Sequence, residues 1–431
     1  MDQALSPSVY MDRRSVSVLA AGHLCIDICQ GAVPALLPFL IAERHLSYAA
    51  AASLVLATSL ASSVIQPVFG GLADRFAAPW FMPLGLLVAG LGLTGAGLAP
   101  DFWEIALAMV VSGIGVATFH PEAARWMNLV AGERRATAMS IFSLGGNLGF
   151  ALGPLLTTAL LLRFGLSGAG WLLVPLAVIS LLLILSFPRL LAHHQRKVAR
   201  RKVAGGAVVN NWRAFWLLTG AVTGRSIVFY GVNTFMTLYW LAVLHQSKAT
   251  GSLALTILLL VGAVTTIISG RLADRYGRRI MVLIGFGALA PALLAFVLLA
   301  PLNMPLAFVL LLPIGIALFA PASVMVVMGQ EYLPVNIGIA SGVTLGLSVS
   351  VGGITAPFFG HLADLYGVQA SLMGLIAVPL LALGVSLALP RDRRRASLSV
   401  GESTQQVETD QQDQQKLDAR DIREGDNLGV Q

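Results

Sequence analysis

Twelve apolar runs, each long enough to cross a lipid bilayer as a helix, divide the first 390 residues. A helix needs about 20 apolar residues to cross a hydrocarbon layer of about 30 Å. The apolar residues are continuous rather than alternating, which excludes a membrane β-barrel. The sequence therefore predicts an all-α integral membrane protein with 12 transmembrane helices. The runs lie near residues 16–41, 47–71, 80–99, 102–123, 134–163, 168–187, 213–244, 249–270, 279–300, 303–328, 337–360 and 368–390.

The composition excludes most other classes of protein. Hydrophobic residues make up 56% of the chain and charged residues 11%, against about 45–50% and about 25% in soluble domains. The basic residues form short clusters between apolar runs without interleaved aromatic residues, so we expect no nucleic-acid partner. Cys25 and Cys29 lie on one predicted helix and indicate neither a disulfide nor a metal knuckle. No HExxH, GxSxG, CxxC or P-loop motif occurs, so we expect no enzyme.

The distribution of lysine and arginine predicts the orientation. With the N-terminus inside, the cytoplasmic segments hold 24 of the 28 basic residues. The outer loops hold only Arg44, Arg163 and Lys248, and Arg225 lies within a span. Cytoplasmic loops are enriched in lysine and arginine, so both termini are predicted to be cytoplasmic.

The sequence repeats after a basic linker. Phe119-His120-Pro121 corresponds to Phe319-Ala320-Pro321 at an offset of 200, and Gly22-His23 corresponds to Gly224-Arg225 at an offset of 202. Such offsets indicate two pseudo-symmetric six-helix bundles, an architecture typical of secondary transporters. We expect a cytoplasmic N-terminus (1–15), an N-terminal bundle (16–187), a basic linker (188–212), a C-terminal bundle (213–390) and a disordered tail (391–431).

A Gly-x-x-x-Asp-Arg motif lies between the second and third spans of each half. Its glycine admits close helix approach, its aspartate can cap a helix N-terminus, and its arginines suit the cytoplasmic interface. Because two copies of this motif lie at matching places in the two halves, the sequence resembles the major facilitator superfamily over residues 16–390. This resemblance implies alternating access between two bundles. The first copy departs from the family pattern at Ala77, Pro79 and Trp80. The predicted gating residues are Gly70, Asp74, Arg75, Gly270, Asp274, Arg275, Gly277 and Arg279.

The fifth span carries Gly149, Gly153 and Pro154, which resemble the first part of the superfamily's antiporter motif, and Pro357 matches Pro154 in the second half. A packing seam of small residues with a proline kink explains these residues by itself. A functional interpretation adds that the helices pivot at this seam.

The first span has one polar face that holds His23, Asp27 and Gln30. Asp27 lies near the middle of the bilayer, where a carboxylate is costly unless it faces water, a partner or a proton pathway. We expect a role in transport for Asp27, and for His23 either such a role or a structural one. The pair could also form half of a metal site, but no further ligand cluster is apparent in the spans, so we expect no metal.

Arg225 occupies the equivalent place in the seventh span, with Phe229 and Asn233 on roughly the same face. Arginine suits bidentate recognition of carboxylate, phosphate or phosphonate. The alternative is an internal ion pair with Asp27, and both hold if the substrate competes for that pair. Asn147, in the fifth span, completes the set of candidate polar residues.

Three segments together resemble the fosmidomycin-resistance branch of the superfamily: GHxxxD around His23 and Asp27, FHPEA at 119–123, and QEYLP with GxASGVTLG at 330–346. This resemblance implies an exporter of phosphonate antibiotics or other small drugs, driven by the proton gradient. Met109 lies near the place of an arginine common in superfamily antiporters, so His120 and Glu122 join His23 and Asp27 as coupling candidates. Alternatively, His120 and Glu122 lie at a helix end near the lipid headgroups.

From the resemblance we expect a proton-coupled efflux antiporter in the bacterial cytoplasmic (inner) membrane. It would act as a monomer on a small molecule and protons within the lipid bilayer, without a cofactor. An uptake symporter for a small organic anion shares the same sequence features and stays open as the alternative.

Overall fold

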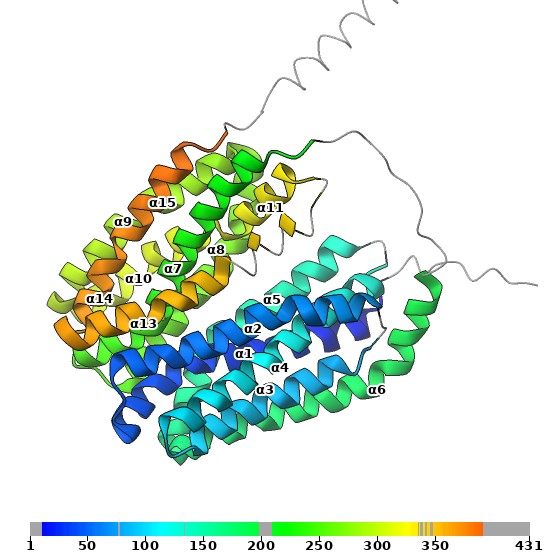
Figure 1. Cartoon of the computed structure of the whole chain (residues 1–431), viewed down its shortest axis with the longest axis horizontal. Helices are drawn as coiled ribbons and strands as arrows, with labels where there is room; N and C mark the ends of the chain where they lie inside the picture. Colours follow the sequence, from blue (N-terminus) through cyan, green and yellow to red (C-terminus); the bar gives the residue numbers. More distant parts are fainter. Residues whose placement is uncertain are drawn as a thin grey trace, which may run out of the picture. The chain divides into compact units, whose positions relative to one another are not determined.

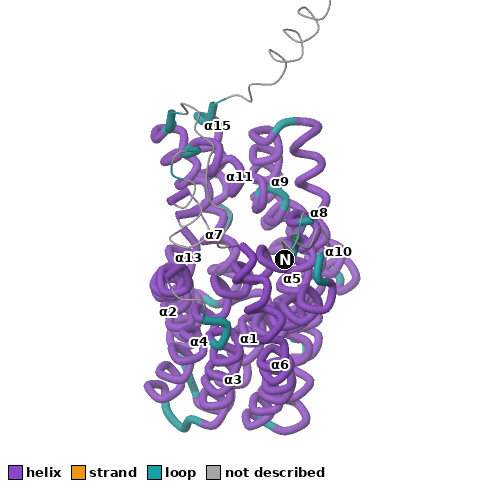
Figure 2. The backbone as a smooth tube through the Cα atoms, turned by 90° about the vertical axis from the view of Figure 1, so that its right-hand side faces the viewer, coloured by secondary structure: helices purple, strands orange, loops and turns teal. Residues whose placement is uncertain are grey.

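The computed structural model describes residues 11–75, 78–132, 134–197, 209–334, 336, 339–340, 343–344 and 348–390. Throughout these residues the secondary structure is helical, without a strand (Figure 2). The first half contains α1 (Arg13–Arg44), α2 (Tyr48–Arg75), α3 (Phe81–Leu98), α4 (Phe102–Val130), α5 (Arg135–Phe164), the 3-10 helix η1 (Leu166–Leu172) and α6 (Leu173–Lys197).

The second half repeats this pattern with more interruptions. It contains α7 (Trp212–Ala242), α8 (Lys248–Tyr276), α9 (Arg278–Leu299), the 3-10 helix η3 (Ala300–Leu302), α10 (Met304–Phe319), α11 (Ala322–Tyr332), α13 (Ser348–Tyr366), α14 (Val368–Leu375) and α15 (Ala377–Leu387). The two halves form neighbouring groups of helices, blue to teal for α1–α6 and green to orange for α7–α15 (Figure 1).

Eleven helical segments within the described residues are long and apolar enough to cross a membrane. They match eleven of the twelve predicted spans, with α10 and α11 together forming the tenth and α14 and α15 the last. The remaining predicted span, 337–360, overlaps α13, and several of its first residues lie outside the described ranges. The all-α membrane fold with two halves is therefore confirmed.

Short polar segments fix the helix ends. Asp12, Asp101 and Ser247 each accept a hydrogen bond from a first-turn N–H of the helix that follows, which satisfies donors that have no partner inside the helix. Gly277 (φ +105°) and Gly367 (φ +84°) provide a backbone conformation that other residues rarely adopt between α8 and α9 and between α13 and α14.

The last helix of the first half continues into the segment expected to be the basic linker. The sequence placed the linker at 188–212, but α6 continues to Lys197. Leucine, alanine, glutamine, arginine and lysine favour helix, so this charged segment extends the helix beyond its apolar part. The linker residues 198–208 and the tail 391–431 lie outside the described residues.

The helices run back and forth between two ends. We call the end where α1 finishes and α2 begins the far end, and the end that carries Arg13 and Trp212 the terminal end. The connections α3–α4, α5–η1, α7–α8, α9–α10 and α13–α14 also lie at the far end. Across the two halves, α2 packs against α13 and α5 packs against α8.

Within the first half, α1 and α5 pack with their backbones in close contact. Gly145, Gly149 and Gly153 of α5 face the carbonyl groups of Ala20, Leu24 and Ile28, which are spaced by one helical turn along α1. A Cβ atom at Gly153 would lie only 2.7 Å from the Ile28 carbonyl oxygen. The contacts support the packing interpretation of the glycine motif, and the pivot stays a prediction. Pro154 lies inside α5 and Pro357 inside α13.

Candidate functional site

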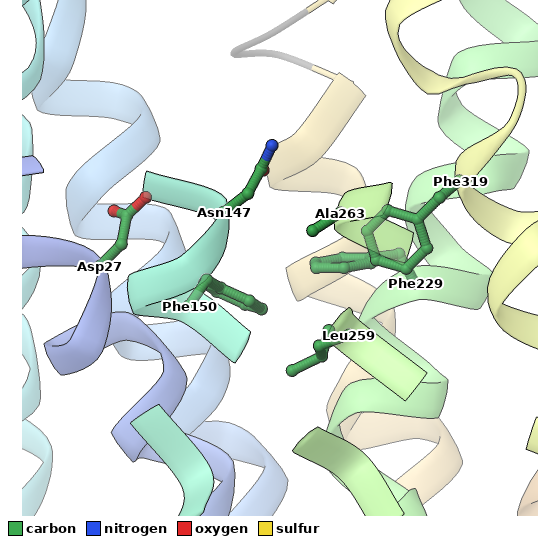
Figure 3. Close-up of a pocket in the computed structure, with 7 residues that line it drawn as sticks. All are labelled: Asp27, Asn147, Phe150, Phe229, Leu259, Ala263 and Phe319. Carbon is green, nitrogen blue, oxygen red and sulfur yellow. The ribbon is translucent and has the colours of Figure 1, made fainter. Parts of the chain in front are cut away.

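A cavity of about 190 Å³ lies between the two halves (Figure 3). Its first-half wall carries Asp27 from α1 and Asn147 from α5, both predicted from the sequence. The remainder of the wall is apolar and largely aromatic, and Phe229 is its one member that the sequence predicted beside the site. The apolar lining residues are Phe150, Phe229, Leu259, Ala263 and Phe319.

Three phenyl rings form a continuous wall across the halves. The ring centroid of Phe229 lies 5.8 Å from that of Phe150 in α5 and 5.8 Å from that of Phe319 in α10. These are ordinary separations for interacting aromatic rings. Sequence reasoning missed Phe150 and Phe319 because isolated phenylalanines in apolar spans carry no signal that separates a cavity wall from a lipid-facing or core position.

Asp27 lies between two histidines from different helices. Its Oδ2 is 3.3 Å from His23 Nε2, and its Oδ1 is 3.1 Å from His120 Nε2. Gln30 Nε2 donates a hydrogen bond of 2.7 Å to the same Oδ1. Asp27 is only 8% exposed. The structure thus unites the predicted polar face of α1 with His120 of α4, and we call His23, Asp27 and His120 the carboxylate cluster.

Backbone carbonyls fix the protonation of one nitrogen in each histidine. His23 Nδ1 lies 2.8 Å from the Phe142 carbonyl oxygen, and His120 Nδ1 lies 2.9 Å from the Val116 carbonyl oxygen. A carbonyl only accepts, so each Nδ1 is the donor, and in a neutral ring Nε2 is then an acceptor. Both Nε2 atoms face carboxylate oxygens. Each of these contacts therefore becomes a hydrogen bond only when a proton lies between the two atoms.

The cluster is closely confined by α5. A Cβ atom on Gly146 would lie 2.5 Å from His23 Nε2 and 2.7 Å from Asp27 Oδ2. One turn earlier on the same helix, Phe142 stacks against the His23 ring, with ring centroids 3.9 Å apart. Sequence reasoning named neither Gly146 nor Phe142. The second glycine of the Gly145-Gly146 pair was the available signal, because a glycine inside a helix indicates close approach.

The expectation that no third ligand group joins His23 and Asp27 is wrong. Potential ligand atoms of His23, Asp27 and His120 lie within 4.8 Å of one another, a combination of imidazole and carboxylate groups that suits transition metals. Helical spacing along α1 alone does not bring in His120, which lies 93 residues further along the chain. The absence of a metal from the protein stays a prediction.

Arg225 does not form the expected ion pair with Asp27, because the two histidines occupy the contacts of that carboxylate. The Arg225 Cζ atom lies 6.0 Å from the Phe229 ring centroid, within cation–π range. Among the described residues, Nε of Arg225 and Oδ1 of Asn233 are buried without a hydrogen-bond partner. Within the part of the chain that the structure describes, no carboxylate pairs with Arg225, which lies one helical turn from the aromatic wall.

Glu122 lies apart from the carboxylate cluster. Its side chain is fully buried, and its carboxylate accepts a 2.6 Å hydrogen bond from Trp126 Nε1 and a 3.4 Å hydrogen bond from Arg125 Nη1. Both of these donors belong to α4, and the backbone of Ala78, ahead of α3, donates a further hydrogen bond to the carboxylate. Its coupling role stays a prediction without support from this geometry.

The basic residues of the second gating motif bind within their own half. Arg278 forms an ion pair with Glu331 of α11, and Arg279 Nη2 donates a 2.7 Å hydrogen bond to the Leu387 carbonyl. A Cβ atom on Gly270 would meet nothing within 4 Å, so the expected close helix approach is absent at that glycine. Arg275 is exposed and contacts the Tyr276 ring. The side chains of 70–77, including Asp74 and Arg75, and of Asp274 lie outside the described residues.

Comparison with known proteins agrees with this architecture. Residues 19–357 match the family model described as Major Facilitator Superfamily. The chain is 32% identical over 383 residues to the uncharacterized MFS-type transporter YfnC of Bacillus subtilis, covering 88% of this chain and 93% of the relative. It is 28% identical to the fosmidomycin resistance protein of Escherichia coli, covering 89% and 95% of the two chains.

A solved structure shares the fold at low sequence identity. A bacterial homologue of the human lysosomal transporter Spinster, in an inward-facing and occupied conformation, superposes with a TM-score of 0.69 at 18% identity. The superposition covers 86% of this chain and 95% of the other. At this level of identity the likeness shows the fold alone.

Proposed function

The chain belongs to the Major Facilitator Superfamily, and on that premise we propose that it is a proton-coupled efflux antiporter of small anionic, phosphonate-like compounds and other small drugs. Its relatives are membrane transporters rather than enzymes. The observation that carries the proposal is the position of Asp27, which lines the cavity between the halves while contacting two histidines.

The carboxylate cluster supports proton coupling. Each of its two His–Asp contacts becomes a hydrogen bond when a proton lies between the two atoms, and its carboxylate lines the cavity proposed to bind the substrate. A buried carboxylate that loses its protonated partners carries an uncompensated charge, which is costly inside a membrane. Substrate arrival and proton release are therefore linked, because both change the charge in one small cavity.

Arg225 and the aromatic wall support an anionic substrate with an apolar part. A guanidinium at this depth costs at least about 2.5 kcal/mol on insertion scales, so an anionic substrate group is a favourable partner. The planar guanidinium of Arg225 can donate two parallel hydrogen bonds to the oxygens of a carboxylate, phosphate or phosphonate. The phenyl rings of Phe150, Phe229 and Phe319 provide the surface for an apolar part. The relative named fosmidomycin resistance protein makes phosphonates the first class to test.

The proposed location is the bacterial inner membrane with both termini in the cytoplasm. In that orientation the terminal end faces the cytoplasm and the far end faces outside, since 24 of the 28 lysine and arginine residues fall on the cytoplasmic side. We propose that the protein acts without a cofactor and as a monomer; the two halves of a single chain together line the cavity, so the cavity is complete without residues from a second copy.

Everted membrane vesicles from an overexpressing strain test the proposal. With an imposed gradient, acidic inside, the vesicles should accumulate fosmidomycin, and a protonophore should abolish the accumulation. Vesicles with Asp27→Asn should behave like vesicles without the protein. Accumulation that survives the protonophore would refute proton coupling, and the absence of accumulation for fosmidomycin and for a panel of anionic and neutral drugs would refute export.

The alternative, a proton-coupled uptake symporter of a small organic anion, uses the same residues in the opposite direction. Right-side-out vesicles distinguish the two. Accumulation driven by an outside-acidic gradient in these vesicles, without accumulation in everted ones, would favour the symporter.

A further inference from the structure

Asp364, near the end of α13, caps a helix of the other half. Its Oδ1 accepts a 2.7 Å hydrogen bond from the Tyr48 backbone N–H, and its Oδ2 accepts a 3.0 Å hydrogen bond from the Ala49 backbone N–H. Both N–H groups belong to the first turn of α2. The carboxylate thus satisfies donors that have no partner within their own helix.

The local sequence of α2 leaves these two donors for Asp364. Ser47, directly before α2, uses its Oγ to accept from the Ala50 N–H at 3.1 Å. It therefore leaves Tyr48 and Ala49 to a partner from outside the helix. A carboxylate at this place also interacts favourably with the positive end of the helix dipole. The contact combines two charge-assisted hydrogen bonds with the dipole, and it exists only while the halves are together at the far end.

Further contacts join the halves toward the far end. Gly360, one turn before Asp364, faces α2 so closely that a Cβ atom would lie 2.7 Å from Ala49 Cα. Thr158 Oγ1 of α5 and Ser252 Oγ of α8 form a 2.5 Å hydrogen bond. Lys248 Nζ lies 3.9 Å from the Phe39 ring centroid. The far end is therefore closed in this structure by matched contacts between α1, α2 and α5 and the second half.

The sequence around Asp364 repeats the gating motif. Residues 360–367 read GHLADLYG, and residues 270–277 read GRLADRYG, an offset of 90. Asp364 corresponds to Asp274, but it lies at the opposite end of the bundle pair because α8 and α13 run in opposite directions. Internal repeats of opposite direction are a feature of transporter folds. A copy of the motif thus lies at each end of the second half.

We propose that Asp364 is the latch that holds the far end closed, and that each transport cycle breaks its two hydrogen bonds to α2. The proposal rests on the proposed transport function only in so far as the two halves must separate at this end when access alternates between the two sides of the membrane. It does not depend on the substrate, the direction of transport or the coupling to protons.

The test measures far-end separation in the purified full-length protein without substrate or gradient. Spin labels on Ser167→Cys of η1 and Leu302→Cys of η3 report the distance between the halves, because both positions are exposed at the far end. The native residues Cys25 and Cys29 are buried. Pulsed electron paramagnetic resonance then gives the populations of the closed and open far end.

Asp364→Asn should raise the ratio of open to closed molecules about five- to tenfold, equivalent to about 1–1.4 kcal/mol. Gly360→Ala should shift the ratio in the same direction, because its methyl group meets Ala49. The matched control is Asp101→Asn. Asp101 caps α4 with hydrogen bonds of 3.1 and 3.2 Å to Trp103 and Glu104, also at the far end but within one half.

An unchanged distance distribution in both Asp364→Asn and Gly360→Ala would overturn the latch. An equal shift in Asp101→Asn would also overturn it, since loss of any helix cap would then have the same effect. A shift confined to the first two variants supports the latch even if proton coupling fails in vesicles, so the two proposals fail independently.

Discussion

Gly146→Ala should uncouple transport by a steric effect on the carboxylate cluster. The added methyl group would lie 2.5 Å from His23 Nε2, whereas ordinary van der Waals contact begins at 3.4 Å. His23 must therefore retreat by about 0.9 Å, the difference between these two distances. The stacked Phe142 ring, 3.9 Å away between centroids, limits that movement.

The energetic cost follows from this confinement. Overpacking of a buried site costs about 1–3 kcal/mol, and the weakened hydrogen bond from His23 Nδ1 to the Phe142 carbonyl adds about 0.5–1.5 kcal/mol. We expect a moderate loss of thermal stability. Displacement of His23 from Asp27 should also remove one of the two His–Asp contacts, so drug-driven proton release should fall well below that of the wild type.

The assay combines a thermal unfolding curve in detergent with proton release from proteoliposomes. Gly153→Ala is the matched control, because its methyl group would overpack the same α1–α5 interface, 2.7 Å from the Ile28 carbonyl oxygen, without touching the cluster. It should lose stability but keep more of its proton release per transported molecule. Gly146→Ala with normal proton release would refute the assigned geometry of the cluster.

Three further substitutions test the remaining assignments. Asp27→Asn keeps the shape of the side chain but removes its charge, so substrate-dependent proton release in proteoliposomes should be lost while substrate binding remains measurable. Arg225→Lys keeps the charge but loses the planar guanidinium, so it should weaken phosphonate binding about tenfold more than binding of a neutral drug. An equal loss of affinity in titrations with both compounds would make Arg225 a structural residue. Asp274→Asn should lower turnover more than substrate affinity, and equal losses in transport kinetics and binding would argue against a gating role.

The fold could be predicted from the sequence because each span must be long enough to cross the bilayer and must satisfy its backbone hydrogen bonds internally, as an α-helix does. The apolar runs near 16–41 and 102–123 correspond to α1 (Arg13–Arg44) and α4 (Phe102–Val130); α1 nearly matches its run, and α4 continues about two turns beyond its own. The charged continuation of α6 to Lys197 was missed, since apolarity marks the membrane-spanning part of a helix and not its end.

The candidate site could be predicted only in part. Helical spacing along α1 places His23, Asp27 and Gln30 on one face, and all three are in contact in the structure. The approach of His120 depends on how α4 rotates against α1, which no local pattern encodes. The predicted Asp27–Arg225 pair failed for the same reason. The opposite charges of Asp27 and Arg225 near the bilayer midplane favoured a pair, but the oxygens of Asp27 already contact His23 and His120.

In the proposed mechanism, substrate binding in the cavity releases protons from the carboxylate cluster. Purified protein in weakly buffered detergent solution, mixed with a drug that the vesicle assay identifies as a substrate, tests it directly with a pH indicator. Wild-type protein should release protons in proportion to the bound drug, and Asp27→Asn should bind the drug without release. Saturable drug binding to the wild type with no change in proton concentration would contradict the claim.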